Sequence, residues 1–364
     1  MNKIISLNNL YTCFLIIFDF VVFNLLKIKA KKDFQFFKKI YLRTDGIGDS
    51  ILFINNINCN NKKNTLYIVS TRNGNFYKDL NAVENYITID KEKFRKNLYY
   101  RFKLLSQIKL IKSDVVVNPL FSRKIDESDI IVKFLNSDKK IGFKGNVAIN
   151  SNMFFYKIGS NYYNKFIEYN ISDDTHELDI NKKLFEIMNS SKNFDLNKMS
   201  LKNFYNEKIH LIYKNYIIIH IGSNDKNKSI PSELILNIRN YLLNNSDKKI
   251  ILTGNSKNER KVAKEIQNHY AERIINGVGK FTIKEIFNLV DKADMIISID
   301  TFIVHIAYFL DKKLICFKKN NINKNRFVPY PKYFKTKNLK TIFTFEKGSD
   351  LIFSEIKNAI DSHL

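Results

Sequence analysis

Short apolar runs rich in Ile and Val recur along this chain and alternate with stretches whose apolar residues follow helical spacing. The runs occur in both halves of the chain: KIYLR, TLYIVS, YITI, DVVVN and KKIGF, then YIIIHI, KIILT, RIIN, MIISI and KLICF. Helical spacing is clearest at 232–243 and 257–269. Strands that alternate with helices form parallel sheets with both faces covered. The pattern therefore predicts an α/β fold with one parallel sheet in each half.

The length of the chain indicates two domains. It has 364 residues, whereas one domain usually has about 100 to 200. Residues 150–214 lack the strand rhythm, and we place the boundary at the end of that stretch. We therefore expect a first domain at 36–205 and a second at 206–348. An amphipathic helix at 349–364 should pack back on the first domain.

The net charge of +24 comes from 60 Lys and Arg residues against 36 Asp and Glu. Such a charge attracts nucleic acid, anionic lipid or phosphorylated substrates, and it does not choose among them. The abundance of Lys and Asn also fits an AT-rich genome. Because the lysines are spread along the chain without a recognisable binding module, a polyanion- or nucleic-acid-binding protein remains only an alternative.

The cysteines indicate neither a disulfide framework nor a structural zinc site. Cys13, Cys59 and Cys316 lie far apart and form no CxxC pair. Such usage fits a reducing, cytoplasmic compartment.

Residues 1–35 hold the most apolar stretch and a basic linker. The apolar run at 10–28 is slightly shorter than the roughly 20 residues that span a bilayer, and Asp19 and Asn24 interrupt it. A secretory signal would have a basic start and a small-residue cleavage site, whereas here the lysine-rich stretch follows the apolar run and no A-x-A site appears. We expect residues 10–32 to lie in the membrane interface, with the lysines on anionic headgroups. A transmembrane anchor and a helix packed on the protein's own surface are the alternatives.

The segment RTDGIGD follows the first expected strand and precedes an apolar helix. Gly46 and Gly48 would let the backbone approach a ligand, and the first amides of the helix would attract an anion. Asp49 is either a helix cap or a general base at a cleft, with Asp45 as the weaker candidate. A dinucleotide-dependent oxidoreductase would need a third glycine where Ile51 stands.

The loop after YIIIHI has the composition of a phosphate-binding turn. Gly222 and Ser223 end the strand, and Lys226 and Lys228 follow. Two lysines and backbone amides could neutralise a diphosphate leaving group. A solvated charged loop is the alternative.

Two further strand ends in the second half carry polar side chains. Gly254 with Glu259 could cup a nucleotide, or form an ordinary strand-to-helix turn. Asp300 and Thr301 end another strand, and His305 lies one helical turn beyond Thr301 on the same face. These three could surround a diphosphate or ribose. A cap and a buried histidine would explain them equally well.

In this order and spacing, the motifs resemble glycosyltransferase family 9, which includes lipopolysaccharide core heptosyltransferases. The resemblance covers roughly residues 38–330. The matching positions are Arg43, Asp45, Ile47, Gly48, Asp49, Gly222, Ser223, Lys228, Ile230, Pro231, Gly254, Glu259, Asp300, Thr301, His305, Ile306 and Ala307. Ile230 replaces the family's tryptophan and Phe302 its glycine after Asp-Thr, which leaves the donor open.

The resemblance implies a GT-B fold: two Rossmann-like domains facing a central cleft, the first for the acceptor and the second for the nucleotide-sugar. It implies metal-independent, inverting transfer. Asp49 would be the base, and Lys228 would contact donor phosphate. The expected acceptor-side residues are Arg43, Asp45 and Gly48. The expected donor-binding residues are Gly222, Ser223, Lys226, Gly254, Glu259, Asp300, Thr301 and His305.

The resemblance thus predicts a bacterial glycosyltransferase of lipopolysaccharide-type biosynthesis, acting at the inner face of the cytoplasmic membrane. It would move a sugar, with heptose from ADP-heptose as the first expectation, onto a lipid-linked or lipopolysaccharide-type saccharide. We expect no cofactor besides the nucleotide-sugar co-substrate, no metal and no nucleic-acid partner. A family member without catalysis that acts as a scaffold is the other alternative.

Overall fold

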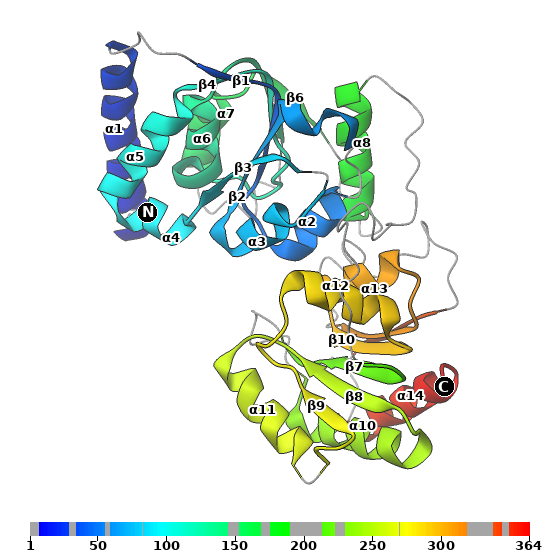
Figure 1. Ribbon diagram of the computed structural model, residues 1–364. Helices are drawn as coiled ribbons and strands as arrows, with labels where there is room; N and C mark the ends of the chain where they lie inside the picture. Colours follow the sequence, from blue (N-terminus) through cyan, green and yellow to red (C-terminus); the bar gives the residue numbers. More distant parts are fainter. Residues whose placement is uncertain are drawn as a thin grey trace. The chain divides into compact units, whose positions relative to one another are not determined.

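The computed structural model describes residues 7–28, 34–54, 59–81, 83–144, 153–168, 175–189, 213–222, 230–268, 270–318, 338–343 and 349–364. The chain forms two compact units (Figure 1). Unit 1 comprises residues 1–46 and 58–170, and unit 2 comprises 47–57 and 171–364.

Unit 1 contains a six-stranded, fully parallel sheet in the order β3-β2-β1-β4-β5-β6. The strands are β1 (Gln35–Arg43), β2 (Thr65–Ser70), β3 (Asn85–Ile89), β4 (Ile111–Asn118), β5 (Asn136–Phe143) and β6 (Lys165–Ile167). In the central strand, Ile40 pairs with Leu66 on one side and with Val116 on the other. This is the strand order of the doubly wound Rossmann fold, in which successive strands are added first on one side of the first strand and then on its other side.

Helices cover the sheet of unit 1. They are α1 (Leu7–Ile28), α3 (Gly74–Lys78), α4 (Lys91–Lys96), α5 (Leu98–Ile108), α6 (Ile130–Phe134) and α7 (Met153–Ser160). Asp90 accepts a hydrogen bond from the Lys93 amide and so caps α4, while Asn97 caps α5 in the same way. Buried residues of α5, α6 and the strands form the core of this unit.

Helix α1 packs one of its faces on unit 1. Thr12, Leu15, Asp19 and Val22 are its buried positions. The Asp19 carboxylate receives two hydrogen bonds from Arg101 of α5, from Nε at 2.7 Å and from Nη2 at 2.5 Å. By length and composition α1 could also cross a membrane. The lysines at 29, 31 and 32 lie outside the described residues.

Unit 2 contains a second six-stranded parallel sheet, in the order β12-β11-β10-β7-β8-β9. The strands are β7 (Tyr216–His220), β8 (Lys249–Thr253), β9 (Ile274–Asn276), β10 (Met295–Ile299), β11 (Leu314–Lys318) and β12 (Leu339–Phe343). Every residue of β7 and β10 is buried, which explains why these strands are continuous apolar runs. If the strands are renumbered in chain order with β7 as the first, their order in the sheet is the same as in the sheet of unit 1.

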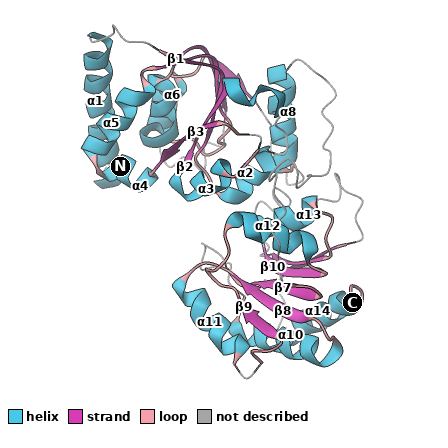
Figure 2. Cartoon of the chain, viewed as in Figure 1, coloured by secondary structure: helices cyan, strands magenta, loops and turns pink. Residues whose placement is uncertain are grey.

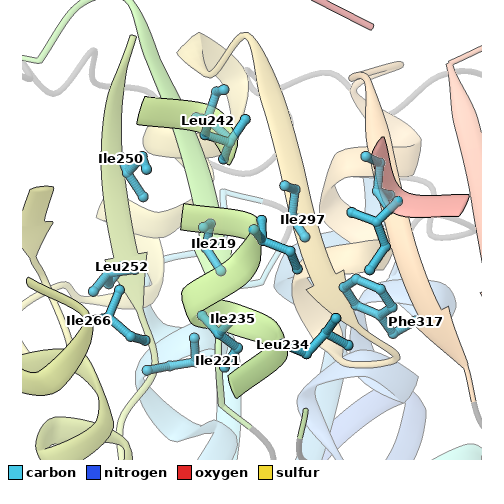
Figure 3. Close-up of a cluster of buried hydrophobic side chains, with 14 of the residues drawn as sticks. Ile219, Ile221, Leu234, Ile235, Leu242, Ile250, Leu252, Ile266, Ile297 and Phe317 are labelled. Carbon is cyan, nitrogen blue, oxygen red and sulfur yellow. The ribbon is translucent and has the colours of Figure 1, made fainter. Parts of the chain in front are cut away.

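Unit 2 contains helices on both faces of its sheet (Figure 2) and two more, α2 and α8, that pack on other helices. The helices of this unit are α2 (Ile47–Ile54), α8 (Glu177–Asn189), α10 (Ser232–Asn245), α11 (Lys257–Gln267), α12 (Ile283–Lys292), α13 (Phe302–Phe309) and α14 (Ser349–Asp361). On one face, α10, α11 and α14 bury apolar side chains against the strands. Figure 3 shows part of this core, with Leu234 and Ile235 of α10 beside Ile219 and Ile297 of the sheet. α12 and α13 lie on the other face.

The position of α14 corrects one expectation from the sequence. Ile352, Ile356 and Ile360 belong to the core of unit 2, and the Tyr241 hydroxyl of α10 donates a hydrogen bond to Asp361. The helix therefore completes unit 2 and does not return to the first domain. Its amphipathic pattern required an apolar partner without specifying which one.

The two units also divide the chain differently from the expected boundary at 205. Helix α2 belongs to unit 2, where it packs against α13 and α8. Phe53 of α2 contacts Phe185 of α8, and the Asn181 side chain donates to the Leu52 carbonyl. α8 therefore belongs with the second sheet, although the sequence pattern assigned it to the first domain.

Candidate functional site

The candidate site of unit 2 lies at the carboxyl ends of β7, β8 and β10. The strand order reverses between the neighbouring strands β7 and β10. In open parallel sheets, ligands bind in the crevice just beyond the carboxyl ends of the two strands between which the order reverses. Gly222 follows β7, and Asp300 and Thr301 follow β10. The expected donor-binding residues Gly222, Gly254, Asp300 and Thr301 thus lie at one edge of the same sheet.

The turn after β8 is built around the carboxylate of Glu259. Its Oε2 accepts hydrogen bonds from the amides of Asn255 at 2.6 Å and Ser256 at 3.0 Å. The Ser256 hydroxyl in turn accepts from the Glu259 amide at 3.2 Å, which completes a capping box at the start of α11. These hydrogen bonds hold the pKa of Glu259 below its usual value even though burial opposes them.

Gly222 and Gly254 both face this carboxylate. A Cβ atom on either glycine would lie 2.6 Å from Glu259 Oε2, well inside contact distance. On Gly222 it would also lie 3.1 Å from the Gly254 α-carbon. Glycine at both positions lets the turns after β7 and β8 approach each other around one negative charge without displacing the Glu259 side chain.

His220 is a residue of this region that the sequence analysis did not single out. It is buried, its Nδ1 lies 2.9 Å from the Thr253 hydroxyl, and its ring meets Phe302 edge to face at 5.7 Å. Burial lowers the pKa of His220 to about 4, although the negative charge of Glu259 acts in the opposite direction. The imidazole is therefore neutral near pH 7. The sequence feature that could have identified His220 is its place at the end of β7, directly before Ile221 and Gly222.

The turn after β10 presents the first amides of α13. Thr301 is the residue before the helix, and its side chain makes no capping hydrogen bond. Its hydroxyl lies 3.5 Å from that of Ser298, and the Asp300 amide donates to the Phe317 carbonyl of β11. Since the first amides of a helix have no partner within it, this end of α13 attracts anions.

Helix α2 places Gly48 of the RTDGIGD segment against His305 of α13. A Cβ atom on Gly48 would lie 3.0 Å from Cδ2 and 3.1 Å from Nε2 of His305, and 3.7 Å from the Phe302 α-carbon. His305 is buried in α13. Asp49 lies in the first turn of α2, so it is not the residue that caps this helix. The turn that carries Asp49 is thus adjacent to α13 within unit 2.

Arg43 and Asp45 lie in unit 1, where they form an ion pair. Arg43 Nε is 3.3 Å from Asp45 Oδ1, with the arginine side chain fully buried and the carboxylate partly exposed. The Asp45 carbonyl accepts a hydrogen bond from the Asn73 side chain. These contacts fix the turn that leads from β1 into α2. The Asp45 carboxylate is thus engaged by Arg43, whereas Asp49 lies in the first turn of α2.

Three expected site residues, Ser223, Lys226 and Lys228, lie outside the described residues. Among the residues that are described, no group of three or more His, Cys, Asp or Glu side chains is placed to hold a metal ion.

Comparisons with known proteins agree with this architecture. Residues 124–330 match the family model described as glycosyltransferase family 9 (heptosyltransferase). No curated protein matches the chain. Among solved structures, the chain is similar to the E. coli heptosyltransferase WaaC with ADP, with 15% identity and a TM-score of 0.67 over 90% of this chain and all (100%) of that one.

Two further structures show the same likeness. WaaC with ADP-2-deoxy-2-fluoro heptose aligns at 16% identity with a TM-score of 0.67, over 90% of this chain and 100% of the other. The family 9 glycosyl transferase from Veillonella parvula DSM 2008 aligns at 14% identity with a TM-score of 0.61, over 91% and 90% of the two chains. The two parallel sheets with their helices therefore form the GT-B fold of the heptosyltransferase structures.

Proposed function

Because this chain belongs to glycosyltransferase family 9, we propose that it transfers heptose from ADP-heptose to a hydroxyl group of a lipid-linked or lipopolysaccharide-type saccharide. The WaaC complexes, which contain ADP and a fluorinated ADP-heptose, support an ADP-linked donor. The contact between α2 and α13 carries the proposal. It joins the turn of the candidate base Asp49 to the helix whose first amides face the candidate diphosphate site.

In the proposed reaction, the Asp49 carboxylate accepts the proton of the acceptor hydroxyl. The oxygen then attacks the anomeric carbon while the bond from that carbon to the diphosphate oxygen breaks. Direct displacement of this kind inverts the configuration at the anomeric carbon. A positioned general base usually contributes roughly a hundredfold to ten-thousandfold to the rate.

The leaving ADP carries the charge that the second domain would stabilise. We assign this role to Lys228, to the Thr301 hydroxyl and to the first amides of α13, which need no metal to act on a diphosphate. Glycine at 222 and 254 keeps the backbone beside β7 and β8 free of side chains. Glu259, already bound to two amides, would accept hydrogen bonds from the ribose hydroxyls through its remaining lone pairs.

The nucleotide-sugar is the co-substrate in this proposal, and no further cofactor or nucleic acid takes part. A lipid-linked acceptor places the enzyme at the cytoplasmic face of the membrane. Helix α1 supports that location, because it is long and strongly apolar.

A donor-binding screen tests this function first. Thermal unfolding would be followed with a panel of nucleotide-sugars and free nucleotides, each with magnesium and with EDTA. At roughly a hundredfold excess over its Kd, a bound donor stabilises a protein by about 2.7 kcal/mol. We expect ADP-heptose and ADP to raise the unfolding temperature equally with and without metal. A panel in which no nucleotide-sugar raises it would remove the transferase assignment.

The catalytic role of Asp49 is tested separately. Asp49→Asn should retain the thermal shift with donor and lose transfer by roughly a hundredfold or more. Asp114→Asn serves as the control, because it removes an exposed carboxylate of β4 and should leave transfer unchanged. Near-normal transfer by Asp49→Asn would exclude this residue as the base.

A further inference from the structure

Helix α1 has two apolar faces, and only one of them is covered by the protein. The residues opposite its buried positions form the exposed face of α1: Leu7, Leu10, Phe14, Ile17, Phe20, Val21 and Leu25. Leu7 is 86% exposed, Ile17 64% and Phe20 59%. A contiguous row of large exposed apolar side chains costs solubility unless a partner covers it, so such surfaces usually mark binding sites.

The covered face is held to unit 1 by polar contacts as well as by packing. Arg101 binds both carboxylate oxygens of Asp19, and its Nη1 donates to the carbonyls of Phe94 and Asp126. Near the start of the helix, the Tyr11 hydroxyl donates to the Arg95 carbonyl at 2.6 Å. Crossing a membrane would require this buried pair to separate or to enter lipid, both of which are costly. α1 is therefore a fixed part of unit 1.

Three lysines lie around the Phe23 ring of this helix, two of them from other elements, and a fourth, Lys140, donates a hydrogen bond to the Lys133 carbonyl at 3.3 Å. The lysine cluster consists of Lys27 on α1, Lys109 after α5, Lys133 on α6 and Lys140 on β5. The ammonium groups of Lys27, Lys109 and Lys133 lie 4.9, 4.4 and 5.3 Å from the centre of the Phe23 ring. Figure 1 shows α1 beside α5, the helix that Lys109 follows.

The members of the lysine cluster repel one another. Burial and the charge of Lys27 lower the pKa values of Lys109 and Lys133, and burial together with Lys109 lowers the pKa of Lys140 to about 8. The carboxylate that attracts Lys133 is Asp19, and Arg101 already binds it. Contacts with the Phe23 ring offset part of the repulsion. An anionic partner would neutralise the lysines and so remove the remaining repulsion between them.

We propose that the exposed face of α1 and the lysine cluster together form a surface by which unit 1 docks, in one fixed orientation, on an anionic lipid bilayer. The apolar side chains would enter the boundary of the acyl chains, and the lysines would meet lipid phosphates. The inference rests on the proposed function in taking the acceptor to be lipid-linked. The docking surface itself contains no residue of the donor site. A two-fold contact with a second copy would pair this surface with itself, and the surface supplies no anionic group for the lysines.

Vesicle binding of the full chain tests this surface. The protein would be sedimented with phosphatidylcholine vesicles that contain or lack phosphatidylglycerol. We expect binding only to the anionic vesicles, with weakening by salt. Ile17→Glu should weaken it at least about tenfold, since the side chain no longer enters an apolar phase. Lys109→Gln with Lys133→Gln should weaken it by roughly thirtyfold, or about fivefold for each lysine.

Matched variants in unit 2 serve as controls. Tyr270→Glu changes an exposed aromatic residue, and Lys257→Gln with Lys261→Gln removes two exposed lysines of α11. These variants should bind vesicles as the unmodified protein does. Equal losses in the control and surface variants, or no binding of the unmodified protein to anionic vesicles, would overturn the proposal. So would a change from dimer to monomer in Ile17→Glu without any vesicle binding, which would assign the face to a second copy.

Two further measurements separate this inference from its alternatives. Without vesicles, the amides of α1 should be protected from hydrogen exchange, because the helix is packed on unit 1. Exchange as fast as in an unstructured peptide would contradict the fixed orientation. The thermal shift with ADP-heptose should be the same in Ile17→Glu as in the unmodified protein. Donor binding without vesicle binding would therefore contradict the docking surface alone, and the reverse result would contradict only the proposed reaction.

Discussion

The imidazole ring of His305 packs against Gly48, so closely that a Cβ atom on the glycine would lie 3.0 Å from the ring atom Cδ2. The two residues are distant in the sequence, and they join the first turn of α2 to the middle of α13. Their contact makes the position of Asp49 depend on the helix of the candidate diphosphate site.

Substitution of Gly48 tests this contact. Alanine is favoured over glycine in a helix by about 1 kcal/mol, but overpacking against a buried ring usually costs about 1 to 3 kcal/mol. We expect Gly48→Ala to lower the free energy of unfolding in urea. In the His305→Ala background the ring is gone, and the same substitution should raise that free energy by up to about 1 kcal/mol. The same sign in both backgrounds would show that the two residues do not press on each other.

The burial of neutral His220 makes stability depend on pH. Its pKa is about 4 in the folded protein and about 6.5 in the unfolded chain. The unfolded state therefore binds the proton more readily, and the stabilisation present above pH 6.5 is lost as the pH falls towards 4. Between pH 7 and pH 5 this effect amounts to about 2 kcal/mol.

Urea unfolding at pH 7 and pH 5 measures this effect in the unmodified protein and in His220→Asn. The variant keeps all other titrating groups, so the difference between the two pH responses belongs to His220. We expect the unmodified protein to lose about 2 kcal/mol more than the variant. Parallel pH responses would mean that His220 is protonated as easily in the folded state as in the unfolded chain.

Two capping boxes in unit 2 allow stability and donor binding to be separated. Glu259 completes one at the start of α11, and Glu285 completes the other with Thr282 at the start of α12. Either residue changed to Ala should cost about 1 kcal/mol of stability. Only Glu259→Ala should weaken the binding of ADP-heptose in a titration. Equal donor affinities in the two variants would restrict Glu259 to a structural role.

The core of unit 1 contains a buried ion pair whose loss should be costly. Arg123 donates to Asp129 at 3.1 Å, and the Tyr163 hydroxyl donates to the same carboxylate oxygen at 2.6 Å. Asp129→Ala would leave the buried guanidinium without its counter-charge, a loss of about 3 to 5 kcal/mol. Glu168→Ala, which breaks the exposed pair with Lys144, is the control and should change little. Comparable unfolding midpoints for the two variants would contradict this ranking.

Most of the sheet architecture follows from the sequence because buried parallel strands are continuous apolar runs. Each expected run became a strand, from KIYLR in β1 to KLICF in β11. Two edge strands were missed. β6 has three residues, and β12 carries Lys340 and Thr341 side by side among its five residues. At the edge of a sheet a strand needs less apolar surface, so its sequence signal is weak.

The candidate site was predictable where it depended on strand ends. Gly222, Gly254 and Asp300 were each expected at the end of a strand, and because parallel strands end together, the sheet brings them to one edge. The other contacts of the site depend on the tertiary fold and were not predicted. His220 was not recognised because it lies among the apolar residues of a strand, and Gly48 and His305 meet only in the folded chain. Likewise, the charge of Asp19 was read as an interruption of an apolar helix, whereas its partner Arg101 lies on another helix.

The assignment of α2 to unit 2 means that the chain passes between the two units at Gly46–Ile47, at Ile57–Asn58 and again at Asn170–Ile171. No single cut in the chain can therefore yield either unit whole. A fragment that ends after the first sheet would carry α2 without α13 and α8, and its apolar residues, such as Phe53, would meet water. The units are architecturally distinct, yet each is built from segments that are not continuous in the sequence.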